Sequence, residues 1–129
     1  MRNVKIAAIQ MQCSTNLQIN LEKAEKMVRQ AGDGAQIILL PELFEREYFC
    51  QQRRYDFYHL AKPVEENDAV QMGMRLAKEL NVVLPISFYE QDINTLYNSI
   101  ACIDADGTLS GVYRKTHIPD DHYYQEKFY

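Results

Sequence analysis

The chain has 129 residues, of which 47% are hydrophobic, and 18 acidic against 14 basic residues leave a formal net charge of −4. This length fits one domain near the lower end of size for a layered α/β fold. No run of like charge indicates a nucleic acid or an anionic membrane as a partner, and no stretch reaches the roughly 18 apolar residues of a membrane span. We therefore expect a cytoplasmic protein that binds neither nucleic acid nor membrane.

The first forty residues have the pattern of a strand, a helix and a second strand. Apolar residues cluster over 4–10 as in a buried strand, and the polar residues 14–16 then offer helix caps. Over 17–31 the apolar residues recur at helical spacing, and Gly32 is a suitable stop. A second strand is predicted over 36–40. This order predicts a right-handed crossover between two parallel strands.

The rest of the chain predicts a loop, a second helix and three further strands. Residues 44–63 are rich in aromatic and charged side chains and predict a loop with short helical turns. Asn67 and Asp68 cap a helix whose apolar spacing continues to Leu80. The strands expected after it cover 82–88, 96–103 and 108–113, with links at 90–94 and 104–107. Short links imply antiparallel strands, so the whole pattern predicts an α/β fold with a mixed sheet.

Two charged residues follow predicted strands and are the first candidates for a catalytic site. Glu42 comes after the apolar strand and Pro41, and Lys115 comes after the strand that ends near Tyr113. Ligands and catalytic groups in α/β folds collect at the carboxyl ends of strands. Partial desolvation next to a core would make Glu42 a better general base, and a lysine beside it would stabilise an oxyanion. Each residue alone also fits a solvated position at the end of a strand.

Several motifs together resemble the nitrilase superfamily of carbon-nitrogen hydrolases. They are the first strand Val4–Met11, the segments Leu39–Phe44 and Tyr113–Pro119, the signature Tyr97-Asn98-Ser99 and the turn Asp104–Gly107. The resemblance runs along essentially the whole chain, and the order and spacing of the motifs are specific. Within the superfamily, residues 44–51 and 124–129 are most similar to the branch of N-carbamoylputrescine amidases.

The resemblance implies an α-β-β-α sandwich, of which this chain would form part, and a Glu-Lys-Cys triad. Glu42 would be the general base, Lys115 the cation that stabilises the tetrahedral intermediate, and Glu126 an accessory glutamate that positions the lysine and the substrate. The substrate would be a small carbamoyl or amide compound, most similar to N-carbamoylputrescine, and no metal or other cofactor is implied. The family habit of pairing sandwiches implies a homo-oligomer.

The aromatic residues of the 44–63 segment allow three interpretations. They could line a substrate cleft, contact another subunit or pack in the core. The residues are Tyr48, Phe49, Tyr55, Phe57 and Tyr58. We expect Tyr48 to contribute to substrate binding, and the neighbouring pair Arg53 and Arg54 to form a solvated face.

The chain departs from the family pattern at the triad cysteine. In the family this cysteine follows the lysine by some tens of residues, and no cysteine follows Lys115 in residues 1–129. Cys13 precedes the base, Cys50 falls in the aromatic loop with packing as its expected role, and Cys102 falls inside a predicted strand, where we expect a buried thiol. Three cysteines at wide spacings fit no disulfide framework and no zinc knuckle. We therefore expect residues 1–129 to be the N-terminal portion of a single carbon-nitrogen hydrolase domain, inactive by itself.

Two alternatives stay open from the sequence. His117, Asp120, Asp121 and His122 form the one cluster of histidines and aspartates, and two histidines with one carboxylate can hold a metal ion. Solvation at the surface explains the same cluster, since no supporting partner is visible. The alternative to an enzyme is a complete short α/β module that binds a ligand or a partner without catalysis.

Overall fold

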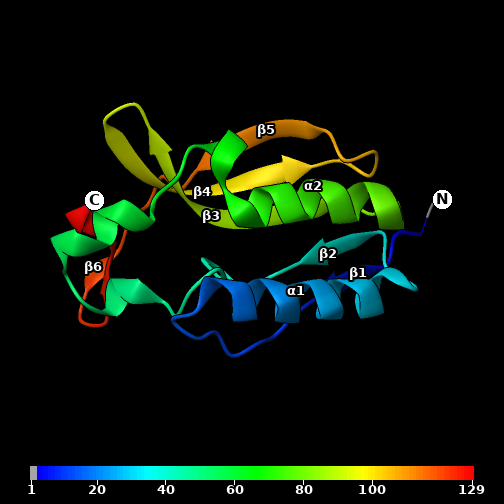
Figure 1. Ribbon diagram of the computed structural model, residues 1–129, viewed down its shortest axis with the longest axis horizontal. Helices are drawn as coiled ribbons and strands as arrows, with labels where there is room; N and C mark the ends of the chain where they lie inside the picture. Colours follow the sequence, from blue (N-terminus) through cyan, green and yellow to red (C-terminus); the bar gives the residue numbers. More distant parts are fainter. Residues whose placement is uncertain (1–2) are drawn as a thin grey trace.

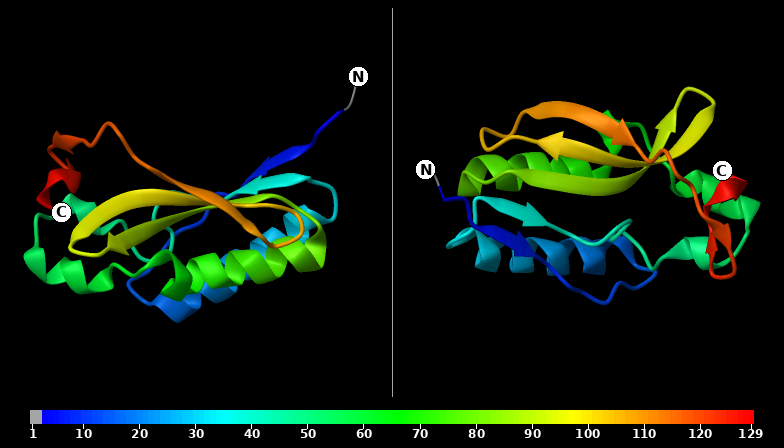
Figure 2. Two further views of the ribbon diagram at one scale, coloured as in Figure 1. Left: turned by 90° about the horizontal axis from the view of Figure 1, so that it is seen from above. Right: turned by 180° about the vertical axis from the view of Figure 1, so that it is seen from behind.

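A mixed β-sheet covered on one face by two helices forms the body of the molecule (Figure 1). The computed structural model describes residues 3–129. The helices are α1 (Leu17–Gly32) and α2 (Asp68–Leu80), and the main strands are β1 (Ile6–Ala8), β2 (Ile37–Leu39), β3 (Leu84–Asp92), β4 (Thr95–Ile103) and β5 (Leu109–Arg114). Seen from above, both helices lie on the same side of the strands (Figure 2). Neither helix of this described part is long and apolar enough to cross a membrane.

The sheet joins a parallel pair to an antiparallel meander. β1 and β2 pair in parallel, and β3, β4 and β5 pair antiparallel in that order. The two parts are connected through Val83, whose N–H donates to Gln36 at 2.8 Å and whose carbonyl accepts from Ile38 at 3.0 Å. β2 and β3 therefore run in parallel, and β5, two antiparallel steps from β3, runs the same way. The predicted parallel pairing of the first two strands, the meander and the mixed sheet are confirmed.

Both helices begin where the sequence predicts. The side chain of Asn16 accepts from the N–H of Ile19 at 3.1 Å, and that of Asn67 accepts from Val70 at 3.0 Å, so each asparagine satisfies an N–H group of a first turn. α2 ends at Asn81, which adopts a left-handed conformation with φ 54°. Each helix buries one apolar face against the sheet.

The hydrophobic core lies between the helices and the sheet. Side chains from α1, α2 and the strands fill it, among them Val28, Ile38, Leu76, Leu84, Ile86 and Ile103. A second apolar cluster lies beside it and is formed by Leu43, Cys50, Ala61, Tyr89 and Phe128. This second cluster brings the 44–63 segment together with the C-terminal residues, so the aromatic loop is packed rather than free.

Most strand boundaries differ from the sequence prediction by one or two residues, and the end of β3 differs by more. The strand expected over 4–10 pairs only from Ile6 to Ala8. β3 continues to Asp92, although a link was expected over 90–94, because Ile93 adopts a left-handed conformation with φ 55° that permits a two-residue turn. The pairing of β3 with β4 therefore extends to Asp92 and Thr95.

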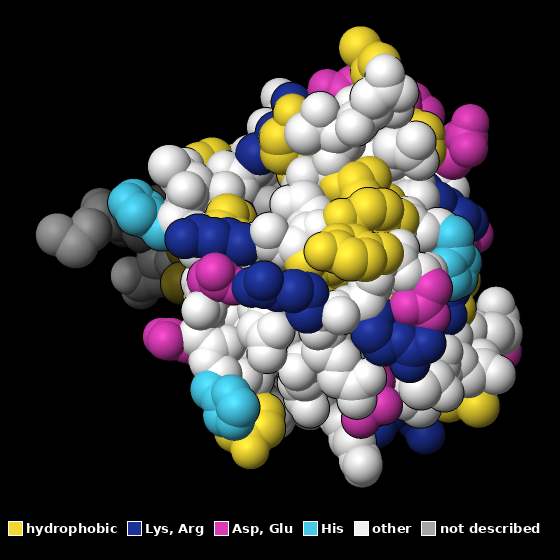
Figure 3. Space-filling view, turned by 90° about the vertical axis from the view of Figure 1, so that its left-hand side faces the viewer, with side chains coloured by type: hydrophobic (Ala, Val, Ile, Leu, Met, Phe, Trp, Pro, Cys, Tyr) yellow, Lys and Arg dark blue, Asp and Glu magenta, His cyan; other side chains and the backbone are white. Residues whose placement is uncertain are grey.

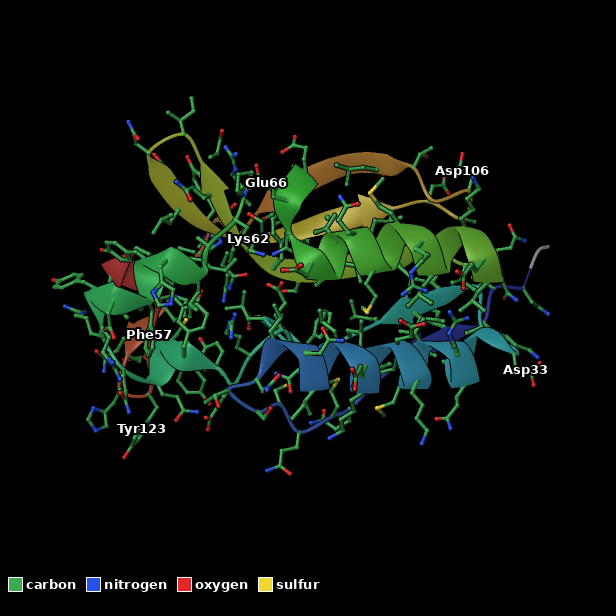
Figure 4. All side chains as sticks on the ribbon, viewed as in Figure 1. Asp33, Phe57, Lys62, Glu66, Asp106 and Tyr123 are labelled. Carbon is green, nitrogen blue, oxygen red and sulfur yellow. The ribbon has the colours of Figure 1, made fainter. Side chains whose placement is uncertain are left out.

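The loop between β2 and α2 contains three 3₁₀ helices and packs against the C-terminal residues. The 3₁₀ helices are Phe49–Gln51, Tyr55–Leu60 and Val64–Glu66, and the C-terminal part contains β6 (Asp120–Asp121), β7 (Tyr124–Gln125) and a 3₁₀ helix at Glu126–Phe128. In Figure 4, Phe57 and Tyr123 lie at one end of the molecule, and Asp33 and Asp106 at the other. Figure 3 shows the first of these ends from outside, with hydrophobic side chains near its middle and Lys and Arg side chains around them.

The opposite face of the sheet carries apolar side chains that no described element covers. Ile6 is 73% exposed, Leu39 43% and Tyr113 59%. Cys102 lies on this face and is exposed, so the prediction of a buried thiol is wrong. The reason is strand alternation: Ala101 and Ile103 point into the helix-covered core, and Cys102 between them must point the other way.

Glu45 is a buried carboxyl that ties the loop after β2 to both helices. The side chain of Asn67 donates to Glu45 Oε1 at 2.9 Å, and the side chain of Asn20 in α1 donates to the Glu45 carbonyl at 2.9 Å. Burial raises the pKa of Glu45 to about 7, although hydrogen bonds from Asn67 and from the backbone of Tyr89 and Ala69 oppose the change. Glu45 therefore keeps its proton up to a higher pH in the folded state than in the unfolded chain.

The substitution Glu45→Gln is expected to remove a pH-dependent loss of stability. As pH rises through the ordinary pKa of glutamate toward about 7, the unfolded chain loses this proton first, so the free energy of unfolding falls. The full fall is about 3 kcal/mol and is complete above the folded pKa. Urea unfolding from pH 4 to 8 should show this fall for the unsubstituted protein and not for Glu45→Gln. The exposed Glu47→Gln is the control, and equal pH profiles for all three proteins would contradict the prediction.

Candidate active site

Glu42 and Lys115 meet at one edge of the sheet, as their positions after strands predict. Glu42 follows β2 and Lys115 follows β5, and these strands run in the same direction, so their carboxyl ends lie at the same edge. Lys115 Nζ donates to Glu42 Oε1 at 2.8 Å. The Glu42 side chain is 47% exposed. The two residues form one ion pair, as the sequence predicts.

Glu126 completes this cluster from the C-terminal 3₁₀ helix. Its side chain is 0% exposed, and Lys115 Nζ lies 2.9 Å from Oε1 and 3.2 Å from Oε2. Tyr48 donates its hydroxyl to Glu126 Oε1 at 2.6 Å. A solvated surface position for Glu126 is thereby excluded. One ammonium group contacts two carboxylates, and the cluster of three has a net charge of −1.

Asn98 in β4 contacts every charged member of the cluster. Its side-chain nitrogen lies 2.6 Å from Glu42 Oε1 and 3.0 Å from Glu126 Oε2. Its backbone carbonyl accepts from the backbone N–H of Lys115 at 2.8 Å. Asn98 belongs to the Tyr97-Asn98-Ser99 signature, which by itself indicates no role for the side chain. Its place near the start of a strand that runs antiparallel to β5 brings it to the same edge of the sheet as Lys115. The predicted order of the strands could have indicated this position.

The backbone after Glu42 is held in an uncommon conformation. Leu43 has a φ of 50°, in the left-handed region that costs a residue with a side chain roughly 1–3 kcal/mol. Its N–H donates to Ser87 Oγ at 3.0 Å, and its side chain is buried in the second apolar cluster. Burial and this hydrogen bond offset the strain, and they fix the direction in which the chain leaves Glu42.

An ion pair between an exposed arginine and a buried glutamate anchors the end of β5 next to Lys115. Arg114 donates to both oxygens of Glu90, at 2.7 and 3.0 Å, and to Asp92 at 2.6 Å. Ser99 Oγ donates to Glu90 Oε2 at 2.5 Å, and the Arg114 guanidinium lies 4.0 Å from the centre of the Tyr97 ring. A bidentate pair with a buried carboxylate is geometrically specific. The backbone of Lys115 is therefore fixed by its own hydrogen bond to Asn98 and by its neighbour.

The contacts of Lys115 and Glu126 keep both groups charged. Burial disfavours the charged form of Lys115, but hydrogen bonds to Glu42 and Glu126 outweigh it and raise the pKa of the ammonium group. Burial likewise disfavours the charged form of Glu126, but hydrogen bonds from Tyr48, Lys115 and Asn98 outweigh it and lower its pKa. At neutral pH the lysine is a cation and Glu126 an anion. The cationic lysine can stabilise developing negative charge on a substrate.

A cavity of about 260 Å³ opens beside Glu42 and Lys115. Its lining consists of Leu39, Leu40, Glu42, Ser87, Asn98, Ser99, Ile100, Tyr113 and Lys115. A larger cavity, of about 390 Å³, lies under the 44–63 segment and contains neither Glu42 nor Lys115. We take the smaller cavity as the candidate active site because the charged groups converge there. It combines apolar walls with a small number of polar groups, as ligand sites do.

The described cysteines do not reach this cavity. Cys50 is buried near Tyr129, with a sulfur to hydroxyl oxygen distance of 3.7 Å, and burial raises the pKa of its thiol to about 12. Burial also raises the pKa of Cys13, and Cys102 is exposed on β4. The two serines of the lining are engaged, Ser87 by Leu43 and Ser99 by Glu90. The cavity contains a base and a cation but no thiolate.

The other residues singled out from the sequence lie beside the charged cluster or at the surface. Tyr48 contacts Glu126 and borders the larger cavity, so the structure puts it beside the charged cluster but outside the lining of the candidate site. Arg53 pairs with Asp120 at 2.5 Å and Arg54 pairs with Asp56, and both arginines are exposed, as predicted. Within residues 3–129, no three His, Cys, Asp or Glu side chains are grouped closely enough to hold a metal ion. The histidines at 117 and 122 are exposed.

Comparisons with known proteins identify the family. The sequence model of the carbon-nitrogen hydrolase family matches residues 5–129. An N-carbamoylputrescine amidase of Arabidopsis thaliana is 51% identical over 129 residues, which are 99% of this chain and 43% of that protein. A citrullinase of Francisella tularensis is 48% identical over 130 residues, which are 100% of this chain and 46% of that protein.

A solved structure shares the fold over the same part. The crystal structure of a carbon-nitrogen hydrolase from Helicobacter pylori G27 matches with a TM-score of 0.84 and 31% identity, over 95% of this chain and 42% of that one. The chain thus spans less than half the length of the relatives named above. With a family match along nearly all of its residues and the fold in common, the chain belongs to the carbon-nitrogen hydrolase family.

Proposed function

We propose that this chain carries the general base and the oxyanion-stabilising lysine of an amidohydrolase that acts on a small carbamoyl compound. The observation that carries the proposal is the Lys115 ammonium held between Glu42 and Glu126 at the mouth of a cavity. We further propose that the nucleophile is a cysteine outside residues 1–129, since no described cysteine reaches this cavity. Family membership supports both parts.

The free atoms of the cluster suit the proposed chemistry. Lys115 and Asn98 both bind Oε1 of Glu42, and none of the residues at 3–129 donates to Oε2, which is therefore open to accept a proton. The Lys115 ammonium has three N–H groups. These contact Glu42 Oε1 and both oxygens of Glu126, and the contact with Glu126 Oε2 is the longest, at 3.2 Å. We propose that a substrate oxygen takes the place of this longest contact.

A covalent mechanism follows from these roles. Glu42 takes the thiol proton, and the sulfur bonds to the carbamoyl carbon while its oxygen gains negative charge beside Lys115. The carbon-nitrogen bond then breaks, and Glu42 returns the proton to the departing ammonia. Water then loses a proton to Glu42 and bonds to the acyl carbon, the carbon-sulfur bond breaks, and Glu42 returns the proton to the leaving thiolate. The carbamic acid released in this way loses carbon dioxide to give the amine. Each step moves one proton through the same carboxylate.

The proposed substrate is N-carbamoylputrescine. The relatives at 51% and 48% identity bear names for hydrolysis of N-carbamoylputrescine and of citrulline, and both compounds carry a terminal carbamoyl group on an amine. The common group supports a carbamoylated amine as the substrate class. The specific choice of N-carbamoylputrescine rests on the slightly higher identity.

The exposed face of the sheet fits the remaining part of the family fold. We propose that Ile6, Leu39 and Tyr113, all exposed here, pack against the second sheet of an α-β-β-α sandwich. A cytoplasmic homo-oligomer stays a proposal from the sequence analysis.

A non-catalytic binding module is the second candidate, favoured by one observation: the cavity has no cysteine in its lining. The complete gene product separates the two functions. Ammonia release from N-carbamoylputrescine, measured against related carbamoylated amines and amides, supports the enzyme. Binding of such compounds without turnover supports the module.

The substitution Glu42→Gln in the complete gene product is expected to lower kcat by about 10²–10⁴-fold, the usual range for loss of a general acid-base group. Glutamine keeps the size of the side chain but cannot accept the thiol proton. Ammonia release under saturating substrate measures the effect. Glu47→Gln, an exposed glutamate on the same loop, is the control, and near-normal turnover of Glu42→Gln would show that Glu42 is not the base.

The substitution Lys115→Met is expected to lower kcat by about 10²–10³-fold, because one preorganised donor to the oxyanion is lost. It also leaves Glu126 buried without its cation, so the melting temperature should fall as well. Lys127→Met, an exposed lysine near the same 3₁₀ helix, should change neither quantity. Turnover similar to that of the unsubstituted enzyme would exclude an oxyanion role for Lys115.

A polypeptide of residues 1–129 is expected to release no ammonia from N-carbamoylputrescine, because its cavity provides a base but no thiolate. Circular dichroism should first establish that the polypeptide is folded. Turnover by the folded polypeptide, abolished by Glu42→Gln, would mean that a nucleophile within residues 1–129 is used.

A further inference from the structure

The side chain of Asn98 lies between the two carboxylates of the candidate active site. Its nitrogen is 2.6 Å from Glu42 Oε1 and 3.0 Å from Glu126 Oε2, and the residue is 4% exposed. Both contacts are within ordinary hydrogen-bond length. The Asn98 side chain is neutral, and it contacts both carboxylates.

The orientation of the Asn98 amide follows from its partners. Ionised carboxylates only accept hydrogen bonds, so the NH₂ group and not the carbonyl oxygen must face them. That group has two hydrogens, one for each carboxylate. The backbone of Asn98 is fixed in β4, where Tyr89 of β3 is its pairing partner, and its carbonyl accepts from the Lys115 N–H at 2.8 Å. One residue of a rigid strand therefore contacts Glu42, Glu126 and Lys115.

A neutral donor has a property here that a second cation would lack. Glu42 and Glu126 repel one another, and Lys115 alone leaves the cluster with one excess negative charge. A second lysine or arginine would neutralise that charge but would also hold Glu42 in its ionised form more strongly, so that Glu42 would accept a proton less readily. An amide donates to both carboxylates and carries no full charge.

We propose that Asn98 is a positioning residue for the proposed hydrolysis: its amide holds Glu42 through Oε1, leaving Oε2 for proton transfer, and braces Glu126 against Lys115. The proposal rests on the proposed function for its catalytic meaning. The hydrogen-bond arrangement itself is independent of which reaction takes place. The two parts can therefore fail separately.

The first test observes the hydrogen bonds in the unsubstituted protein. In the complete gene product labelled with ¹⁵N-asparagine, the two side-chain amide protons of Asn98 should both shift when Glu42 and Glu126 become protonated on acidification. The Asn94 side chain, in the exposed turn between β3 and β4, is the internal control and should not follow these changes. Amide protons of Asn98 that do not respond to acid would overturn the proposal, whatever the enzyme's activity.

The second test removes the donor. Asn98→Asp keeps the shape of the side chain, Asn98→Ala removes it, and Asn94→Asp is the matched control for an added charge. With ¹³C-labelled glutamate, the titration midpoint of Glu126 should move upward in both Asn98 variants, because a donor to its ionised form is lost, and stay in place in Asn94→Asp. A Glu126 midpoint that is unchanged in a folded Asn98 variant would overturn the proposal.

The third test is kinetic. Misplacing a catalytic group by about 1 Å costs roughly 10²-fold in rate, so Asn98→Ala is expected to lower kcat by about 10²-fold with a nearly unchanged KM. A raised KM with a normal kcat would show that only substrate binding is weakened, and it would overturn the positioning role. If the unsubstituted protein has no turnover but both NMR results are as expected, the proposed function fails while the hydrogen-bond arrangement stands.

Discussion

The ammonium group of Lys115 lies between two carboxylates that reach it from distant parts of the chain. Glu42 is 73 residues away and Glu126 is 11 residues away, with N–O distances of 2.8 and 2.9 Å. Because Glu126 is fully buried, removing the lysine would leave a buried charge without its partner, which typically costs about 3–5 kcal/mol. The C-terminal residues are therefore held to the sheet edge by the same contacts that form the candidate active site. Structure and chemistry depend here on one ion-pair cluster.

The residues that neighbour Glu42 and Lys115 in the sequence are themselves held in place by hydrogen bonds. Leu43 is fixed by Ser87 just after Glu42, and Arg114 is fixed by Glu90 just before Lys115. Asn98 joins the two sides from β4. Strand ends restrained in this way lose little conformational freedom when a substrate binds, which is the condition for a preorganised site. The half-exposed side of Glu42 is the open side of the arrangement.

Local patterns predicted most of the fold. The caps at Asn16 and Asn67 and the short links between β3, β4 and β5 are local signals, and the structure confirms the elements they predict. Cys102 was wrongly expected to be buried because a strand pattern does not say which of two faces is covered. Burial depends on which other segments pack on a residue.

The sequence by itself determined the strand, helix and meander order, the place of Glu42 and Lys115 after strands that end at one edge, and the family resemblance. These features follow from short-range periodicity and from the spacing of motifs, and both can be read directly from the sequence. Only the tertiary structure decided that Glu126 is buried on Lys115, that Tyr48 binds Glu126 rather than lining the cavity, and that Asn98 donates to both carboxylates. Each of these is a contact between different elements of the fold, and its geometry is set by sheet register and loop packing, which no local pattern specifies.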